Sequence, residues 1–471
     1  MLGWEYPPHI SGGLGTACEG LTQALARRGI EIDFVVPRLY GEERAEHMQI
    51  LGAADAGPYR ATRSHVIGAV HGAPNISVAQ SASEESGAAP VSSRTIRTIA
   101  VPAMLKPYLD PATYEMLLEE TGPTPVREGT PLSGPHTDPP ATPTNDEPQP
   151  RSAQPAPSIQ RAEEHYGSDL FAEVARYAAT ATRRVRGVQY DLVHAHDWMT
   201  FPAGAEIAAR AGAPLVTHVH SLEYDRAAEG ADRDIVEVER RGLREATRVV
   251  AVSYYTRGLI HRIHGTNLDK ISVVHNGVYT RETVKAYEQQ RTSQGPIVLF
   301  LGRVTFQKGP EYFVEAAARV LQSVPDATFV MAGSGDMLPR MKGMVEDLGI
   351  EESFRFPGFV RGAELERTFS TADVYVMPSV SEPFGIAPLE AMSYDRPVVV
   401  SKQSGVSEVL RNALKVDFWD VDKMASQIVG LLELPELRRV IVDRAREEIR
   451  HIHWDAAAEK LIPIYESLVT H

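Results

Sequence analysis

Two glutamates near the C-terminal end have the clearest capacity for chemistry in this sequence. Glu382 and Glu390 stand eight positions apart in the stretch SEPFGIAPLE. They could be a catalytic acid–base pair, ligands for sugar hydroxyl groups, or ordinary residues of a helix start. Glu382 precedes a proline and should be extended, whereas Gly385 and Ile386 should begin a helix with Glu390 in its first turn. This layout favours two carboxylates that bind hydroxyl groups at opposite ends of one elongated ligand, whose phosphates would lie at the N–H groups of Gly385 and Ile386.

Two cations follow another predicted strand. Arg303 and Lys308 lie in the stretch GRVTFQKG, before a helix that should begin near Pro310. A guanidinium offers a fork of donors, an ammonium offers a point charge, and the helix start adds free N–H groups. At an effective dielectric constant near 20, a cation about 4 Å from a phosphate charge is stabilised by ~4 kcal/mol before desolvation. The pattern predicts a diphosphate clamp; the alternative is a solvated basic loop.

A glycine loop and a histidine motif lie in the N-terminal half. Gly12 and Gly13 link a first strand to a first helix, and paired glycines let the backbone approach a ligand closely. His194 and His196 end another strand, in DLVHAHDWMT. Ligands in open α/β sheets bind beyond the carboxyl ends of the strands, which makes both motifs candidates for a site. A histidine at a strand end is, however, more often a hydrogen-bonded structural residue.

We expect no metal site in this chain. The spacing of His194 and His196, and of His218 and His220, would allow metal ligation. No third ligand beside either pair is evident from the sequence, and Cys18 is the only cysteine.

Size and composition exclude several classes of protein. The 471 residues suffice for two or three domains, and the net charge of −14 argues against bulk nucleic-acid binding. A single cysteine permits no intrachain disulfide and favours a reducing compartment. No run of about 18 apolar residues indicates a membrane span. We therefore expect a cytoplasmic protein, with peripheral membrane association and the oligomeric state left open.

The order of the elements predicts an α/β fold. Short β-branched runs alternate with amphipathic helical patterns, as in doubly wound parallel sheets. The stretch 121–160 holds 11 of the 33 prolines and is predicted to be a disordered insertion, and 52–94 a looser excursion. A polar segment around 273–295 is predicted to be the hinge between two Rossmann-like halves. The candidate strands are 32–36, 191–194, 214–218, 248–252, 271–275, 297–301, 327–332, 373–377 and 397–401.

The motifs taken together resemble those of the family-4 (group 1) retaining glycosyltransferases of the GT-B fold, including glycogen-synthase-like members. The resemblance covers essentially the whole chain outside about 52–165. It rests on the Gly12-Gly13 loop, HAHDW, HNGV, GRVTFQKG, GSG, FPGFV and the pair Glu382 and Glu390. It implies two Rossmann-like doubly wound parallel-sheet domains that face each other across a cleft.

The resemblance also implies a division of the chain. Residues 1–280 would form the acceptor-side domain, 293–448 the nucleotide-sugar domain, and 449–471 a helix that crosses back to the first domain. The implied reaction is metal-independent, retaining transfer of a hexose from a nucleotide-diphosphate sugar to a saccharide or other hydroxyl acceptor. No cofactor beyond that co-substrate is implied. The sugar, base and acceptor are not identified.

The same resemblance implies a role for each candidate residue. Arg303 and Lys308 would bind the diphosphate and stabilise it as the leaving group. Glu390 would bind the ribose and Glu382 the transferred sugar. The implied set also places Gly385 and Ile386 at the phosphate or sugar, Phe359 and Val360 at the nucleobase, and Gly12, Gly13 and His196 across the cleft.

One departure and three alternatives accompany this interpretation. Bacterial starch and glycogen synthases place a lysine two positions before the glycine pair, where this chain has Ile10. They also lack the second glutamate, so this chain should fall outside that group. The alternatives are a sugar-nucleotide epimerase, an α-glucan phosphorylase and a non-catalytic sugar-nucleotide-binding protein.

Overall fold

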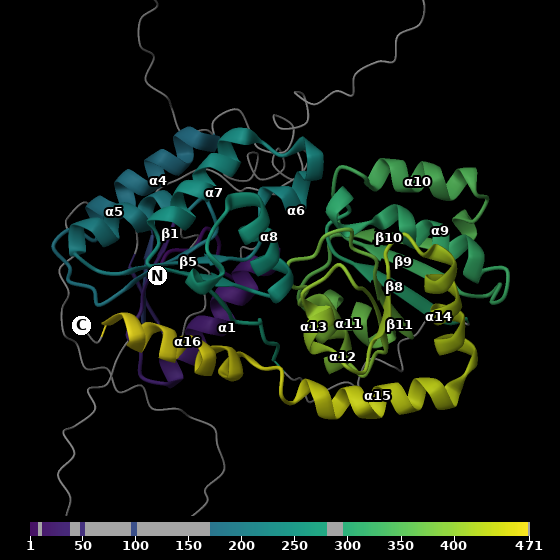
Figure 1. The fold of residues 1–471 in the computed structure, drawn as a ribbon. Helices are drawn as coiled ribbons and strands as arrows, with labels where there is room; N and C mark the ends of the chain where they lie inside the picture. Colours follow the sequence, from purple (N-terminus) through teal and green to yellow (C-terminus); the bar gives the residue numbers. More distant parts are fainter. Residues whose placement is uncertain (8–11, 38–47, 52–95, 101–169, 280–294, 470–471) are drawn as a thin grey trace, which may run out of the picture.

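The computed structural model describes residues 1–7, 12–37, 48–51, 96–100, 170–279 and 295–469. Four features predicted above lie outside the described residues: the proline-rich insertion, the excursion at 52–94, Ile10 and most of the hinge. Two α/β regions lie side by side, an N-terminal region (described residues of 1–279) and a C-terminal region (295–449) (Figure 1).

Seven strands of the N-terminal region form parallel pairs. They run in the order β2-β3-β1 and β4-β5-β6-β7. The isolated pairing of Leu2 with both Val35 and Ala195 joins the two sets. The strands are β1 (Asp33–Val36), β2 (Met48–Leu51), β3 (Ile96–Ala100), β4 (Val193–His196), β5 (Leu215–Val219), β6 (Arg248–Ala251) and β7 (Ile271–Val273).

The first residues of the chain therefore occupy a central strand position. Leu2 donates its N–H to the carbonyl of His194 and accepts from the N–H of His196, at 2.8 and 3.0 Å. On the other side, Val35 donates to Met1 at 2.9 Å and Gly3 donates to Val35 at 3.1 Å. The short segment predicted to precede the glycine loop is thus paired on both edges.

The C-terminal sheet has six parallel strands in the order β10-β9-β8-β11-β12-β13. Numbered along the chain, this is the order 3-2-1-4-5-6 of a dinucleotide-binding fold, whose strand order reverses between β8 and β11. The strands are β8 (Ile297–Leu301), β9 (Thr328–Ala332), β10 (Phe354–Gly358), β11 (Val374–Met377), β12 (Val398–Ser401) and β13 (Leu414–Val416).

Helices cover both sheets (Figure 1). In the N-terminal region these are α1 (Gly13–Arg27), α4 (Leu170–Arg184), α5 (Phe201–Ala211), α6 (Glu223–Ala227), α7 (Arg233–Glu245) and α8 (Tyr254–His264). The rest are α9 (Pro310–Val320), α10 (Leu338–Asp347), α11 (Ala363–Thr371), α12 (Ala387–Ser393), α13 (Val406–Val409), α14 (Val421–Glu433), α15 (Pro435–Ile449) and α16 (Trp454–Val469). None of the described helices is long and apolar enough to cross a membrane.

All nine predicted strands are present, with ends shifted by up to two residues. Four strands were not predicted: β2, β3, β10 and β13. β10 contains a glycine and a proline, and β13 has only three residues, so neither shows a continuous apolar pattern. The predicted α/β class with two parallel-sheet, Rossmann-like regions is confirmed.

The last helix returns to the N-terminal region. In Figure 1 the yellow helices α15 and α16 pass along both regions, and α16 packs against α1. Trp454 of α16 is buried in the cluster that contains Ala17, Cys18 and Leu21 of α1. The indole lies so close to Gly20 that a Cβ atom there would be 2.2 Å from the ring. A glycine in α1 is therefore required for this close packing.

Candidate functional site

The predicted donor residues follow the two strands at which the C-terminal strand order reverses. Arg303 and Lys308 lie in the loop after β8, and Glu382 lies in the loop after β11. Because β8 and β11 are neighbours and parallel, both loops leave the same edge of the sheet. This edge is where open α/β sheets bind ligands.

Lys308 and Glu382 form an ion pair. The ammonium of Lys308 lies 2.5 Å from Oε2 of Glu382, and Ser379 donates its hydroxyl to the same oxygen at 3.3 Å. Gly309 brings the two loops together, because a Cβ atom there would be 2.3 Å from the carbonyl of Pro378. Glu382 is 5% exposed, so the pair is largely shielded from water. The structure therefore brings a residue that is predicted to bind phosphate into contact with a residue that is predicted to bind sugar.

Gln307 supports both loops. Its side-chain oxygen accepts a hydrogen bond from the guanidinium of Arg303 at 3.0 Å. Its backbone carbonyl accepts from the N–H of Val380 at 2.9 Å. Gln307 is buried, in the short 3-10 turn η5 (Phe306–Lys308). The loop that carries the cations is thus tied directly to the loop that carries Glu382.

The helix after Glu382 begins later than predicted. α12 starts at Ala387, and Ile386 is its N-cap, whereas we expected Gly385 and Ile386 to begin the helix. Gly385 has φ of +96°, which glycine adopts without strain, so it ends the loop instead. Glu390 lies in the first turn as expected.

The phenol of Tyr375 in β11 is affected electrostatically by both glutamates. Burial raises the pKa of its phenol well above the ordinary value, and the carboxylates of Glu382 and Glu390 raise it further. The hydroxyl donates to the carbonyl of Leu301 at 3.2 Å. The charges of both glutamates thus act on one buried side chain of the sheet.

Gly13 begins α1 and faces the C-terminal region. A Cβ atom on Gly13 would lie 3.8 Å from Cδ1 of Ile386, at the start of α12. The N-cap Gly12 is extended and exposed. The carboxylate of Glu5 accepts the N–H of Gly15 at 3.1 Å in the same helix start. The structure thus brings the predicted glycine loop next to the loop after β11 in the other region (residues 378–386, called the donor loop below).

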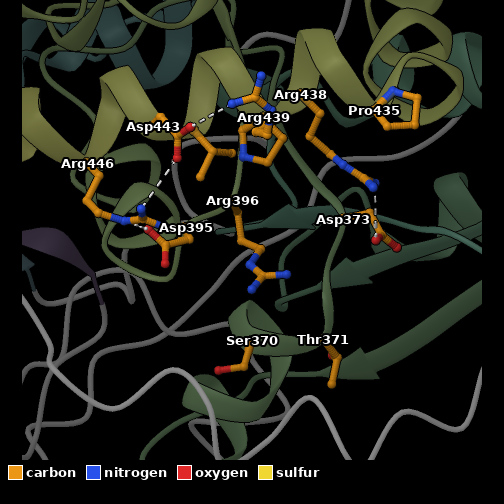
Figure 2. A pocket seen from close by; sticks show the side chains of 12 residues that line it. Ser370, Thr371, Asp373, Asp395, Arg396, Pro435, Arg438, Arg439, Asp443 and Arg446 are labelled. Carbon is orange, nitrogen blue, oxygen red and sulfur yellow. Dashed lines mark hydrogen bonds and ion pairs between the residues drawn. The ribbon is translucent and has the colours of Figure 1, made fainter.

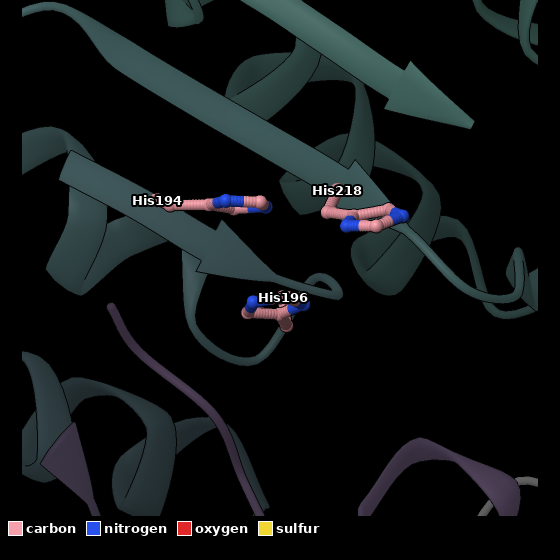
Figure 3. A group of neighbouring side chains, drawn as sticks. All are labelled: His194, His196 and His218. Carbon is pink, nitrogen blue, oxygen red and sulfur yellow. The ribbon is translucent and has the colours of Figure 1, made fainter. Parts of the chain in front are cut away.

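His196 lies inside a stack of imidazoles rather than on the surface. His194, His196 and His218 are fully buried side chains of β4 and β5 (Figure 3). The rings of His194 and His196 are stacked with centroids 4.3 Å apart. His196 reaches the half-buried His220 through a 2.9 Å contact between Nδ1 and Nε2. Burial lowers the pKa of all four histidines, that of His220 to about 3, so the stack is neutral.

The expectation that no third metal ligand lies near the histidine pairs is wrong. Nitrogen atoms of His194, His196 and His218 lie within 4.8 Å of one another. A metal ion lies near the plane of each ligating imidazole, about 2 Å from its nitrogen. The planes of His194 and His196 are only 11° apart and face each other, so their lone pairs do not converge. As they stand, the rings are packed together rather than arranged around an ion.

Asp197 follows the stack and connects two strand ends. Its Oδ1 accepts the N–H groups of His220 at 2.6 Å and Ser221 at 3.3 Å, and its φ is +60°. Burial raises the pKa of Asp197 to about 7, although these hydrogen bonds and Arg226 act in the opposite direction. The sequence indicated Asp197 only as the residue after the histidines.

The predicted nucleobase contacts follow β10. Phe359 is 56% exposed, whereas Val360 is buried. The turn before them needs a glycine, because Gly358 has a φ of +79°. The carbonyl of Gly358 accepts a hydrogen bond from the N–H of Gly333 at 2.7 Å. An exposed phenyl ring beside the carboxyl edge of the sheet is available for a planar ligand.

Sequence reasoning missed the residues with which the N-terminal region contacts the donor loop. Ser381 donates its hydroxyl to Asp225 of α6 at 2.6 Å and lies 2.9 Å from the hydroxyl of Tyr255. Burial raises the pKa of Asp225 to about 6, while the hydrogen bond from Ser381 lowers it. Asp225 and Ser381 are 156 positions apart, so no local pattern could have connected them.

A separate cavity lies at the opposite end of β11. It has a volume of about 570 Å³, and Asp373, just before β11, is part of its lining (Figure 2). Four of its charged groups are paired: Arg446 with Asp395 at 2.9 Å and Arg438 with Asp373 at 3.7 Å. Because the donor loop follows β11, this cavity is not the candidate site.

The fold and the site define a two-region GT-B-type protein, with the predicted donor-binding residues at the switch point of the C-terminal sheet. Family models agree along the chain. Residues 284–448 match "Glycosyl transferases group 1", 141–282 match "Glycosyltransferase Family 4", and 1–82 match "Starch synthase catalytic domain".

Two curated relatives show the family. An uncharacterized glycosyltransferase of Methanocaldococcus jannaschii is 33% identical over 295 residues, which are 59% of this chain and 75% of the relative. A D-inositol 3-phosphate glycosyltransferase of Acidothermus cellulolyticus is 31% identical over 300 residues, 59% of this chain and 67% of the relative. The chain belongs to the group 1 glycosyltransferases, which confirms the resemblance and the predicted enzyme class, a hexosyltransferase.

Solved structures agree on the fold. HepE from Anabaena, in complex with UDP and glucose, matches with a TM-score of 0.55 at 22% identity. The match covers 64% of this chain and 84% of that protein. The expected GT-B fold is confirmed.

Proposed function

We propose that this enzyme is a retaining, metal-independent hexosyltransferase that uses a nucleotide-diphosphate sugar. The acceptor is a hydroxyl group of a saccharide or another molecule. The observation that carries the proposal is the ion pair between Lys308 and Glu382. It lies at the switch point between β8 and β11, and Arg303 is on the same loop as Lys308. The complex of HepE with UDP and glucose supports the ligand class, because its fold is similar.

The donor would lie along the carboxyl edge of the C-terminal sheet. Arg303 and Lys308 bind the diphosphate, because a guanidinium and an ammonium match phosphate oxygens in charge and geometry. Glu390 accepts hydrogen bonds from the ribose and Glu382 from the hexose. Arg303, which Gln307 already orients, needs little reorganisation to receive the ligand.

The remaining predicted residues would complete the donor site. The backbone of Gly385 and Ile386 contacts phosphate or sugar, and Phe359 and Val360 contact the nucleobase. Gly12, Gly13 and His196 would close the site from the N-terminal region. The short distance between Gly13 and Ile386 supports this closure.

Retention would follow from displacement on one face of the sugar. The bond between the anomeric carbon and the β-phosphate oxygen breaks, and the acceptor oxygen forms a bond to the same carbon from the same side. The proton of the acceptor hydroxyl passes to the departing phosphate. Lys308 and Arg303 stabilise the negative charge that grows on the phosphate, which is the electrostatic contribution of this chain.

Metal independence has a structural rationale. The two cations can neutralise the diphosphate, and the rings of His194 and His196 are stacked in nearly parallel planes. No further cofactor is proposed. The boundaries 1–280, 293–448 and 449–471 and a cytoplasmic location are part of the same proposal.

The test is a screen of the purified protein against UDP-, ADP- and GDP-sugars. Thermal stabilisation and sugar hydrolysis are measured with and without EDTA. We expect one nucleotide class to raise the Tm and to be hydrolysed equally well in EDTA. Activity that EDTA abolishes would refute metal independence. Absence of stabilisation by all three classes, or pyridoxal absorbance of the protein, would refute the nucleotide-sugar transferase.

A further inference from the structure

The loop that carries Glu382 is held from the other region of the molecule. Ser381, the residue before Glu382, contacts Asp225 of α6 and Tyr255 of α8. A serine hydroxyl has one proton, and Ser381 gives it to Oδ1 of Asp225. Tyr255 must therefore donate to Ser381. The three residues form a directed chain of hydrogen bonds that ends on a buried carboxylate.

The residue after Glu382 is held from the same side. The carbonyl of Pro383 accepts hydrogen bonds from the hydroxyls of Ser253 at 2.6 Å and Thr256 at 3.2 Å. Ser253 is the N-cap of α8, and both hydroxyls are buried. Side chains of the N-terminal region thus fix the backbone on both sides of Glu382.

A second contact locks α8 to the C-terminal region. The carboxylate of Glu408, in α13, accepts the N–H groups of Tyr254 at 2.9 Å and Tyr255 at 2.6 Å. His275 lies 3.0 Å from the same carboxylate. A carboxylate at a helix start is favoured by the free N–H groups there. This contact holds the start of α8 against the C-terminal region, where the hydroxyl of Tyr255 reaches Ser381.

We propose that Asp225 and Tyr255 are positioning residues for Glu382. They act through the hydroxyl of Ser381 and hold the donor loop where Glu382 meets Lys308. The hexose ligand is then correctly placed only when the acceptor-side region is docked on the donor loop. The proposal rests on the proposed role of Glu382 in binding the transferred sugar.

Two single variants and their combination test the proposal. Tyr255→Phe and Ser381→Ala each remove one hydroxyl of the chain, and the double variant removes both. Two matched controls remove hydroxyls elsewhere: Tyr190→Phe, whose hydroxyl donates to Asp33, and Ser370→Ala, whose hydroxyl donates to the carbonyl of Glu366. All variants are made in the full chain.

Kinetics with UDP-glucose give the first measurement. We expect kcat for sugar transfer to fall about tenfold in each single variant and no further in the double variant, because the two hydroxyls act as one chain. The Kd of UDP should stay within about twofold, since UDP lacks the sugar that Glu382 binds. Unchanged kcat, a hundredfold fall in the double variant, or a parallel loss of UDP binding would overturn the proposal.

Hydrogen exchange of the ligand-free protein gives the second measurement. The N–H of Glu382, which donates to the carbonyl of Gln403 at 2.9 Å, should exchange about tenfold faster in the two single variants than in the controls. Equal exchange in variants and controls would overturn the positioning role. This measurement needs no nucleotide sugar, so its result does not depend on the proposed function. Failure of the proposed function would instead appear as wild-type protein that transfers no sugar.

Discussion

The ammonium of Lys308 and the carboxylate of Glu382 neutralise each other at the centre of the site, 2.5 Å apart. Both lie in loops at the switch point of the C-terminal sheet, and both are more than three-quarters shielded from solvent. A donor diphosphate would attract Lys308, and its sugar would offer new partners to Glu382. Binding would therefore exchange one ion pair for two ligand contacts.

Removing the Lys308 ammonium should abolish this exchange. We expect Lys308→Ala to lower kcat by ~10² or more, because a cation at a developing phosphate charge contributes mainly in the transition state. The far-UV CD spectrum should be unchanged. Lys402→Ala is the matched control, since it removes a lysine whose ion pair with Asp417 is on the surface. Wild-type turnover in Lys308→Ala would contradict the diphosphate clamp.

The two glutamates should differ in their kinetic effects. Glu390→Ala removes the proposed ligand of the ribose, which would be bound equally before and during reaction, so the KM for the donor should rise about tenfold. Glu382→Ala removes the proposed ligand of the reacting sugar, so kcat should fall about tenfold or more. Initial-rate kinetics over a range of donor concentrations separate the two. Equal effects on both constants would refute this division.

The buried carboxyl of Asp197 should make stability depend on pH. Its folded pKa of about 7 is above the ordinary value of 3.8, so the folded state binds this proton more tightly than the unfolded state. Its contribution therefore favours folding below pH 4 and is lost as the pH rises to about 7.

Asp197→Asn should remove that dependence. The asparagine keeps an oxygen for the N–H groups of His220 and Ser221 and tolerates the positive φ. At 1.36 kcal/mol per pKa unit, the gain in unfolding free energy at pH 8 is up to about 4 kcal/mol, with none at pH 4. Urea denaturation at both pH values measures it. A loss of stability at pH 8 would show that the charge itself is needed.

The histidine stack should act in the opposite direction. Burial lowers the folded pKa of His218, so the unfolded chain binds the proton first as the pH falls. Stability is therefore lost below pH 6.5. His218→Phe keeps a flat ring and should reduce the slope of unfolding free energy against pH by ~1.4 kcal/mol per unit between pH 6 and 5. An unchanged slope would mean that His218 is not neutral in the fold.

Adding one methyl group to α1 at Gly20 should disrupt the packing between α1 and α16. Gly20→Ala would place Cβ 2.2 Å from the Trp454 indole, and overpacking of this kind costs ~1–3 kcal/mol. Gly343→Ala, in a helix with open space around the glycine, is the control and should stabilise the protein by up to about 1 kcal/mol. Thermal unfolding of both variants tests the packing. Equal Tm shifts would refute it.

Local patterns in the sequence were sufficient for the fold class and for most elements. Apolar runs predicted nine strands, and the motif after each strand placed the candidate residues at carboxyl edges. Glycines and prolines predicted the loops, although the start of α12 was wrong because Gly385 adopts a positive φ. These features depend on backbone preferences over a few residues, which the sequence displays directly.

Tertiary structure alone decided which of these pieces meet. The pairing of β8 with β11 brings Lys308 to Glu382, and Leu2 pairs with Val35 and Ala195 although they are far away in the chain. The stacking of His218 on His194 likewise follows from the parallel register of β4 and β5.

Contacts between the two regions were beyond the sequence for the same reason. Ser381 reaches Asp225 only when two complete sheets dock, and neither residue belongs to a periodic pattern that marks its partner. Strand order and docking depend on the complementary surfaces of whole elements, summed over many weak contacts. The sequence therefore determined the kinds of residue available for the chemistry, and long-range packing determined their neighbours.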